Sequence, residues 1–232
     1  MQYLAIGNNA KTVKSDKGGE YLTAILYLRP DDDLCPMSRL AQCQAPCLNT
    51  AGRGAFSNVQ QARAAKTAAF KRDPVAFVDA IAADVRVALR KAAKLSVRLV
   101  VRLNGTSDIP WEHMRGSDGK TLFEQFPDVQ FYDYTKLPNR KVPANYHLTV
   151  SYSGANPAYA RKALDPKHGH NVAVVFDTPK GKPLPLFWGG RRVIDGDLTD
   201  LRFTDPDNVI VGLRAKGQAR SDASGFVVRL AA

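Results

Sequence analysis

Seven short segments of the chain are rich in apolar and β-branched residues and are bounded by glycine, proline or polar clusters. Several are apolar throughout rather than alternating, which is typical of strands that are covered on both faces. Helical or polar stretches separate them, so the two kinds of segment alternate along the chain. The predicted strands are residues 21–28, 96–103, 129–133, 147–152, 172–176, 209–213 and 226–230.

The strongest helical pattern follows Asp73. This residue is a favourable N-cap, Pro74 suits the first helical position, and apolar residues recur at helical spacing from Val78 to Leu89. The basic residues after Leu89 suit the carboxyl end of the helix dipole. Further helical segments are predicted at residues 57–71, 110–114, 122–126 and 156–164.

The alternation of strands and helices indicates an α/β fold with a parallel sheet and outer helices. A closed eight-stranded barrel needs roughly 250 residues, and this chain has 232. We therefore predict a partial (βα) barrel of about six parallel strands, with a flat doubly wound sheet as the alternative. Residues 1–232 are expected to form a single α/β domain, either continuous or with residues 185–232 as a small C-terminal extension. Functional groups should follow the carboxyl ends of the strands.

Charge adds a second feature. The chain carries 33 Lys and Arg against 22 Asp and Glu, a net charge of +11. Residues 53–102 contain 11 basic and three acidic side chains and so hold most of this surplus. A concentrated positive charge favours polyanionic partners, so we expect a nucleic acid or a phosphorylated small molecule. The alternative is a basic surface that serves only solubility.

The apolar segments are all short. None approaches the ~20 residues that a membrane helix requires, and the first residues lack the basic and apolar pattern of a secretory leader. The expected location is therefore the cytoplasm, and no membrane partner is expected.

The three cysteines of the chain, Cys35, Cys43 and Cys47, lie in one polar loop after the first predicted strand, with the spacing C-x7-C-x3-C. Thiolates suit iron–sulfur clusters, zinc and copper(I). Electron-transfer clusters usually take four cysteines, so three would leave one iron of a [4Fe-4S] cluster open to a substrate or cofactor. The alternatives are a structural zinc with one histidine, a disulfide with a free thiol, or three unliganded cysteines.

The cysteine loop resembles a family of uncharacterised phage proteins, the gene product 88-like group. The similarity begins at Cys35-Pro36 and includes Cys43, Cys47, Gly52 and Gly54. It continues through Asp73-Pro74, residues 102–108 and residues 132–136, and so covers roughly residues 20 to 136. That family in turn looks like distant kin of radical S-adenosylmethionine enzymes, although the spacing here differs from their C-x3-C-x2-C.

The resemblance implies a partial βα barrel whose first loop holds a [4Fe-4S] cluster through three cysteines. It also implies that S-adenosyl-L-methionine binds the open iron and is cleaved reductively to start radical chemistry. A basic nucleic-acid-binding protein, in which the cysteines hold a structural zinc or cluster, is the second hypothesis.

Polar residues follow the next three predicted strands. Asn104, Ser107 and Asp108 are candidates for binding a cofactor; alternatively they form an ordinary turn in which Asp108 caps the helix near Pro110. Lys136 ends the third strand. Asp108 and Lys136 are the candidate catalytic residues. Further candidates for cofactor binding end the fourth strand, namely Ser151 and Ser153.

Charged residues near the carboxyl end carry weaker signals. The acidic run from Asp195 to Asp205 lacks the glutamate of a calcium loop and is expected to form turns and salt bridges. Arg214, Lys216 and Arg220 are either phosphate ligands or solvated charges. His168 and His170 are expected in an ordinary loop.

Overall fold

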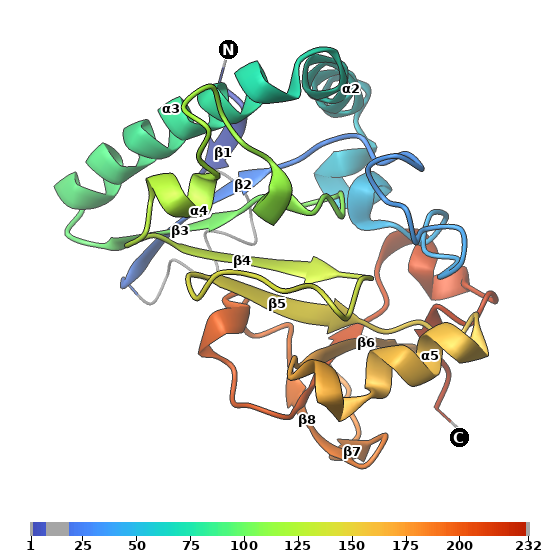
Figure 1. Cartoon of the computed structure of the whole chain (residues 1–232). Coiled ribbons are helices and arrows are strands. Elements are labelled where there is room, and N and C mark those ends of the chain that lie inside the picture. The colour runs from blue at the N-terminus through green and yellow to red at the C-terminus, as the bar shows by residue number, and fades with distance from the viewer. Residues whose placement is uncertain (1, 8–18, 231–232) are drawn as a thin grey trace.

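The computed structural model describes residues 2–7 and 19–230, in which ten strands form one mixed sheet (Figure 1). The order across the sheet is β1-β2-β3-β4-β5-β6-β9-β8-β7, and β10 pairs with β6. The strands are β1 (Leu4–Ile6), β2 (Tyr21–Leu26), β3 (Arg98–Arg102), β4 (Gln130–Thr135), β5 (Tyr146–Ser151), β6 (Val172–Phe176), β7 (Phe187–Trp188), β8 (Arg191–Asp195), β9 (Ile210–Arg214) and β10 (Val227–Val228).

The sheet is mostly parallel. From β2 to β8 every neighbouring pair is parallel, whereas β1 and β7 are antiparallel at the two ends of the order. The order follows the chain from β1 to β6, as it does around a βα barrel, whereas a doubly wound sheet reverses direction at its middle. The sheet is open. The predicted α/β class with a largely parallel sheet is therefore confirmed.

All seven predicted strands are present, and the structure adds β1, β7 and β8. The pattern missed β1 and β7 because they have only three and two residues. It missed β8 because Arg191–Asp195 is largely polar, although Val193 to Asp195 pair with β9. Residues 187–228 thus supply four strands to the same sheet as the rest of the chain.

The helices are α2 (Ser57–Arg72), α3 (Pro74–Lys94), α4 (Leu122–Gln125) and α5 (Pro157–Leu164). The Asp73 carboxylate accepts a hydrogen bond from the backbone N–H of Ala76 at 2.9 Å, which confirms the predicted N-cap of α3. The segment predicted at 110–114 is the 3-10 turn η3 (Trp111–His113). No helix in the described part of the chain is long and apolar enough to cross a membrane.

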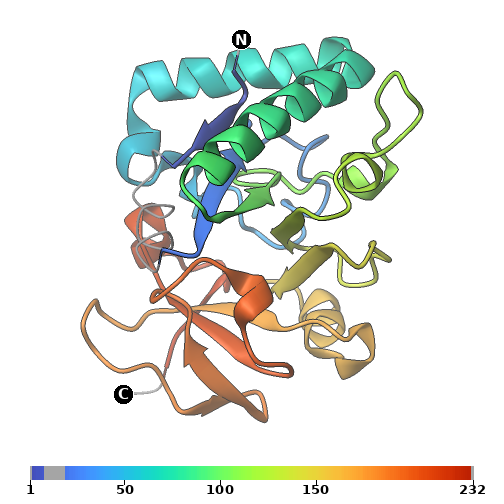
Figure 2. The same ribbon diagram turned by 90° about the vertical axis from the view of Figure 1, so that its left-hand side faces the viewer.

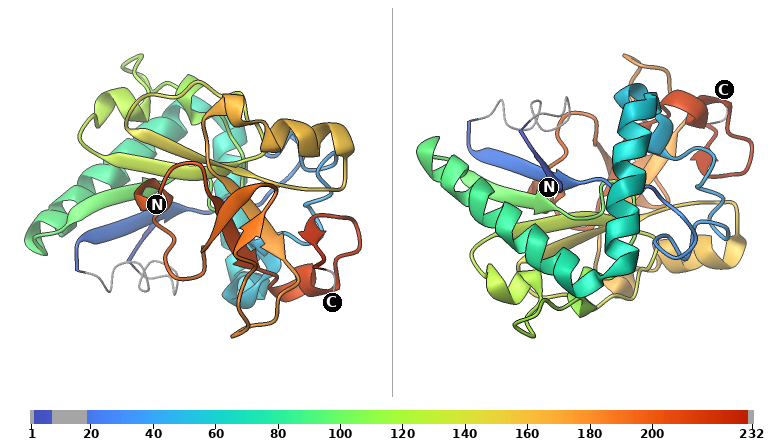
Figure 3. Two further views of the ribbon diagram at one scale, coloured as in Figure 1. Left: turned by 90° about the horizontal axis from the view of Figure 1, so that it is seen from below. Right: turned by 90° about the horizontal axis from the view of Figure 1, so that it is seen from above.

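The two faces of the sheet differ in polarity. The apolar side of α3, including Val78, Ile81 and Val85, packs with Phe131 and Leu148 in the main core on the outer face. Figures 2 and 3 show α2 and α3 together on one side of the molecule and the β7–β8 hairpin on the opposite side. On the inner face, β4 and β5 instead carry polar side chains, among them the buried Tyr132 and Thr149 and the half-buried His147, whose Nε2 is buried.

Candidate functional site

A cavity of about 200 Å³ lies at the carboxyl ends of the parallel strands. One buried water needs only roughly 10–15 Å³, so this cavity has the size of a ligand site. Its walls come from the cysteine loop, residues 102–108, residues 134–136, Ser151, and the segments around β6, β9 and β10. The cavity therefore lies where site loops belong in βα folds.

All three cysteines line this cavity. Two hydrogen bonds hold their loop against the sheet: the backbone N–H of Asp108 donates to the Leu34 carbonyl at 2.8 Å, and the Ser153 hydroxyl donates to the Ala41 carbonyl at 2.7 Å. The loop after β2 and the loop after β3 are thus neighbours, as the order of the predicted strands implies. Residues more than 70 positions apart in the chain meet at one site.

Gly105 allows this close approach. A Cβ at this position would lie 2.6 Å from the Leu26 carbonyl oxygen and 2.7 Å from the Tyr27 ring. The Gly105 N–H instead donates to that carbonyl at 3.0 Å. The loop after β3 can therefore lie directly on the end of β2, where the cysteine loop begins.

None of the three thiols forms a disulfide, and each is half-buried. Burial raises the pKa of each, and for Cys35 the nearby Asp108 carboxylate adds to the effect, which brings its pKa to about 12. Two cations oppose this trend. Lys136 lowers the pKa of Cys43, while the backbone N–H of Asn49 and the Arg63 guanidinium lower that of Cys47. The surroundings of the loop therefore favour neutral thiols, and a positively charged ligand at the cavity would favour their thiolate forms.

No group of three or more His, Cys, Asp or Glu side chains converges on a single metal position in the part of the chain that the structure describes. None of the four histidines, all within that part, lines the cavity. A Cys₃His zinc site would need its four ligand atoms within about 2.0–2.3 Å of one ion. The chemistry of the donor set around the cavity is three thiols and one carboxyl group, that of Asp108.

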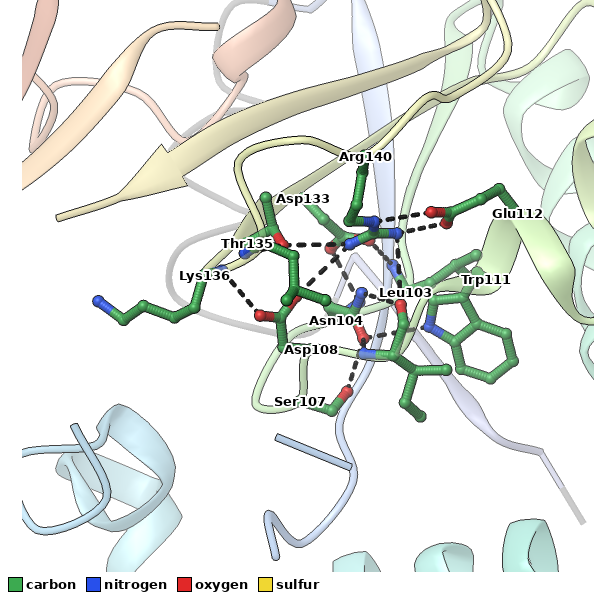
Figure 4. A network of polar contacts seen from close by, with 12 residues as sticks. Leu103, Asn104, Ser107, Asp108, Trp111, Glu112, Asp133, Thr135, Lys136 and Arg140 are labelled. Atoms are coloured by element: carbon green, nitrogen blue, oxygen red, sulfur yellow. Dashed lines mark hydrogen bonds and ion pairs between the residues drawn. The ribbon is translucent and has the colours of Figure 1, made fainter. Parts of the chain in front are cut away.

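Lys136 lies across the cavity from the cysteine loop. Its ammonium group donates to the Ser151 carbonyl at 2.8 Å, the Ser151 hydroxyl at 2.9 Å and the Tyr152 carbonyl at 3.0 Å. Burial lowers its pKa to about 8, although Cys43 and Asp108 act in the opposite direction. Figure 4 shows its side chain extending away from the network around Asp108. The sequence places Lys136 at the end of β4, and the structure places its ammonium group at the end of β5.

Asp108 is almost completely buried. Its carboxylate accepts from the Lys136 backbone N–H at 2.7 Å and from Arg140 at 3.4 Å (Figure 4). Burial nevertheless raises its pKa. The residue at the N-cap of η3 is Pro110, without a side-chain cap, so the alternative in which Asp108 caps that turn is wrong.

Arg140 is a site residue that the sequence analysis did not single out. It comes from the loop after β4, and its guanidinium bonds Glu112 at 2.8 and 2.5 Å as well as reaching Asp108 and Thr135. These bonds connect the loop after β4 to the loop after β3. A lone arginine in a polar loop carries no pattern, so only the contact with Asp108 identifies it.

Asn104 and Ser107 line the cavity, but their polar atoms organise their own loop. The Asn104 side-chain oxygen accepts from the Ser107 hydroxyl, the Ile109 N–H and the Trp111 indole at 2.8–3.1 Å, and its amide donates to the Ile109 carbonyl. Ser153 is fully buried behind the cysteine loop. Ser151 is the serine of this pair that lines the cavity.

The basic segment 53–102 is divided by the fold. Arg63 is buried, where it donates to both side-chain and backbone oxygens of Asn49 at 2.6 Å, and Lys66 donates to the Tyr3 carbonyl. Arg102 is buried on the inner face, with Asp200 at 2.9 Å. The cations exposed on α3 lie toward its carboxyl end, which leads into the amino end of β3 and is therefore remote from the cavity. They are Arg86, Arg90, Lys91 and Lys94.

The acidic run near the carboxyl end forms turns and salt bridges as predicted. Arg214 pairs with Asp195 and Asp197 at 2.9–3.0 Å, and Lys216 pairs with Asp197. Both cations line the cavity on the side of β9, although their charges are balanced by these carboxylates.

These features define an α/β protein with an open, mostly parallel sheet and a cysteine-lined cavity at the carboxyl ends of its strands. The chain matches the family described as gene product 88 over residues 3–230, and it belongs to that family. No curated protein and no solved structure matches it.

Proposed function

We propose that this protein is an iron–sulfur protein in which Cys35, Cys43 and Cys47 hold a [4Fe-4S] cluster at the cavity, with S-adenosyl-L-methionine as its cofactor. One observation carries the proposal: the three cysteines of the chain all line one ligand-sized cavity at the carboxyl ends of the parallel strands. Three thiolates leave one iron without a protein ligand, and that iron would face the cavity.

The donor set supports a cluster more than a zinc ion. Zinc requires four ligands around one point, and the described side chains show no such convergence. A [4Fe-4S] cluster with one open iron would need only the three thiolates as protein ligands, and the cavity walls hold three thiols and no histidine. Its ligands would be anionic, and the buried cations Arg63 and Lys136 are placed to offset that charge at Cys47 and Cys43.

The cavity also offers groups that suit the amino-acid end of the cofactor. Asp108 supplies a carboxylate for an ammonium group, and Lys136 supplies a cation for a carboxylate. Arg140 holds Asp108 in place from behind. A reduced cluster would supply the electron for reductive cleavage of the sulfonium of S-adenosyl-L-methionine, and Asp108 and Lys136 would bind and orient that cofactor.

The test is iron and acid-labile sulfide analysis of protein purified without oxygen. Brown protein with about four irons and four sulfides per chain is expected for a [4Fe-4S] cluster. Colourless protein that contains one zinc and no sulfide would overturn the proposal.

The substitution Asp108→Asn is expected to weaken binding of S-adenosyl-L-methionine by about ten- to a hundredfold, the usual value of a charged hydrogen bond. Thermal stability should also fall, because the Asn amide can accept only one of the two hydrogen bonds that the Asp108 carboxylate accepts from the Lys136 N–H and Arg140, so binding is compared at a temperature at which circular dichroism shows both proteins folded. Equilibrium dialysis on the reconstituted protein measures the binding. Asp128→Asn, at an exposed position remote from the cavity, is the control. Unchanged affinity in Asp108→Asn would remove this residue from the site.

The exposed cations of α3 favour a second candidate function, non-specific binding of nucleic acid. Phosphate contacts release counterions, so the logarithm of affinity should fall linearly with the logarithm of salt concentration. Neutralising Arg86, Arg90, Lys91 and Lys94 together should reduce that slope by about 3 to 4. Binding titrations with duplex DNA at several salt concentrations measure it.

The control removes the same charge elsewhere, at four exposed cations distant from α3. An equal change of slope in both variants would show that net charge rather than the α3 surface causes binding. Absence of binding by the wild type at low salt would end this candidate. The control positions are Arg161, Lys162, Lys180 and Arg192.

A further inference from the structure

A layer of buried polar side chains lies on the inner face of the sheet beneath the cavity. The register of β4 and β5 places Tyr132 beside His147 and Tyr134 beside Thr149. Arg102, at the end of β3, lies over the Tyr134 ring with its guanidinium carbon 4.9 Å from the ring centre. Arg102 and Tyr134 also line the cavity, so the layer begins at the cavity floor.

The other side of this layer comes from the segment after β8. There the 3-10 turn η5 (Arg202–Thr204) packs against β4 and β5. Arg202 is fully buried. Burial lowers the pKa of His147, and the charge of Arg202 lowers it further. The two arginines are neutralised locally, because Arg102 pairs with Asp200 at 2.9 Å and Arg202 lies 3.2 Å from Asp205.

Unsatisfied hydrogen-bonding atoms are concentrated in this layer. In the described part of the chain, ten buried side-chain nitrogen and oxygen atoms lack a hydrogen-bond partner, and seven of them belong to the layer. Three of these seven are in ion pairs, Arg202 Nη1 with Asp205 Oδ2 at 3.2 Å and Arg102 Nε with Asp133 at 3.7 Å, which leaves four with neither kind of partner. Folded proteins leave very few buried polar atoms unpaired, and a local concentration of them points to a bound polar species. The four atoms without either kind of partner are Tyr132 Oη, His147 Nε2, Thr149 Oγ1 and Arg202 Nε.

The chemistry of these atoms identifies the species. An additional ion is disfavoured, because the arginines already face carboxylates. The unpaired atoms include both donors and acceptors, and water can serve both. We propose that this layer is an internal binding site for ordered water, continuous with the floor of the cysteine cavity. These waters extend the polar floor of the cavity into the interior of the sheet, whatever ligand the cysteines hold.

The isosteric substitution Thr149→Val tests the proposal. If the hydroxyl is bound to water, Val removes that hydrogen bond and the variant should unfold at lower urea concentration and lower temperature than the wild type. If the hydroxyl is buried without a partner, Val relieves an unsatisfied group and should be as stable as Thr or more stable. Val also favours a strand at least as much as Thr does, so lower stability of Thr149→Val could not be attributed to a weaker preference for the strand.

Thr149→Ser keeps the hydroxyl and is the matched control, and Tyr132→Phe tests a second atom of the layer in the same way. Magnetic relaxation dispersion of water nuclei, which detects long-lived internal water, gives an independent readout. Lower stability of Thr149→Val and Tyr132→Phe, with a weaker dispersion in each, is the expected result. Unchanged or increased stability in both variants, or a wild type without long-lived internal water, overturns the proposal.

Discussion

Replacing any one of Cys35, Cys43 or Cys47 with alanine is expected to remove most of the bound iron and sulfide. Under the proposed function the three residues would act as one ligand set, and the chain has no fourth cysteine that could replace one of them. The cavity contains no histidine that could replace a lost thiolate.

Iron, sulfide and visible absorbance of the three variants, purified without oxygen, provide the measurement. Met37→Leu is the control, because Met37 lines the same cavity within the same loop but carries no thiol. Full iron occupancy in any two of the alanine variants would contradict a shared site. Circular dichroism shows whether each variant is folded. If all three alanine variants lose both iron and folded structure, the more conservative serine variants are measured instead.

The substitution Arg102→Met is expected to cost about 3–5 kcal/mol of folding free energy. Arg102 is 7% exposed at its side chain and lies 2.9 Å from Asp200, which is 10% exposed. Removing the cation takes from the buried Asp200 carboxylate its ion pair with Arg102, which costs more than the loss of the attraction alone. Urea unfolding at neutral pH measures the change.

Asp200→Leu and the double variant complete a thermodynamic cycle. The double variant should be less destabilised than the sum of the two single variants, since replacement of both charges leaves neither unpaired. Strict additivity would show that the two residues do not stabilise one another. The cycle also separates a structural contribution of Arg102 from its contribution to the cavity floor.

Charge illustrates why composition alone misplaces a site. The sequence indicates one basic segment from residue 53 to residue 102, and a polyanion surface is the direct interpretation. In the folded protein Arg63 lies beneath Cys47 and Arg102 lies inside the sheet. The exposed remainder on α3 is remote from the cavity. Charged residues that are close in the sequence lie apart in the structure, because their side chains point in different directions from a helix or strand.

The local pattern of the chain determined its elements and its class. Largely apolar runs are sufficient to predict β2, β3 and β6, because a buried parallel strand requires them on both faces. The Asp73-Pro74 pair is sufficient to predict the start of α3, because capping depends on neighbouring residues alone. The grouping of three thiols in one loop after β2 is likewise a property of the sequence.

Only the tertiary structure decided which groups meet. The contact of Asp108 with Leu34, the reach of Lys136 to Ser151 and the bond of Arg140 to Asp108 join different loops. Such contacts depend on strand order and register. The short-range periodicity of apolar residues, which identifies strands and helices, contains no information on either. The polar β8 is recognisable only beside β9, because its hydrogen bonds rather than its side chains make it a strand.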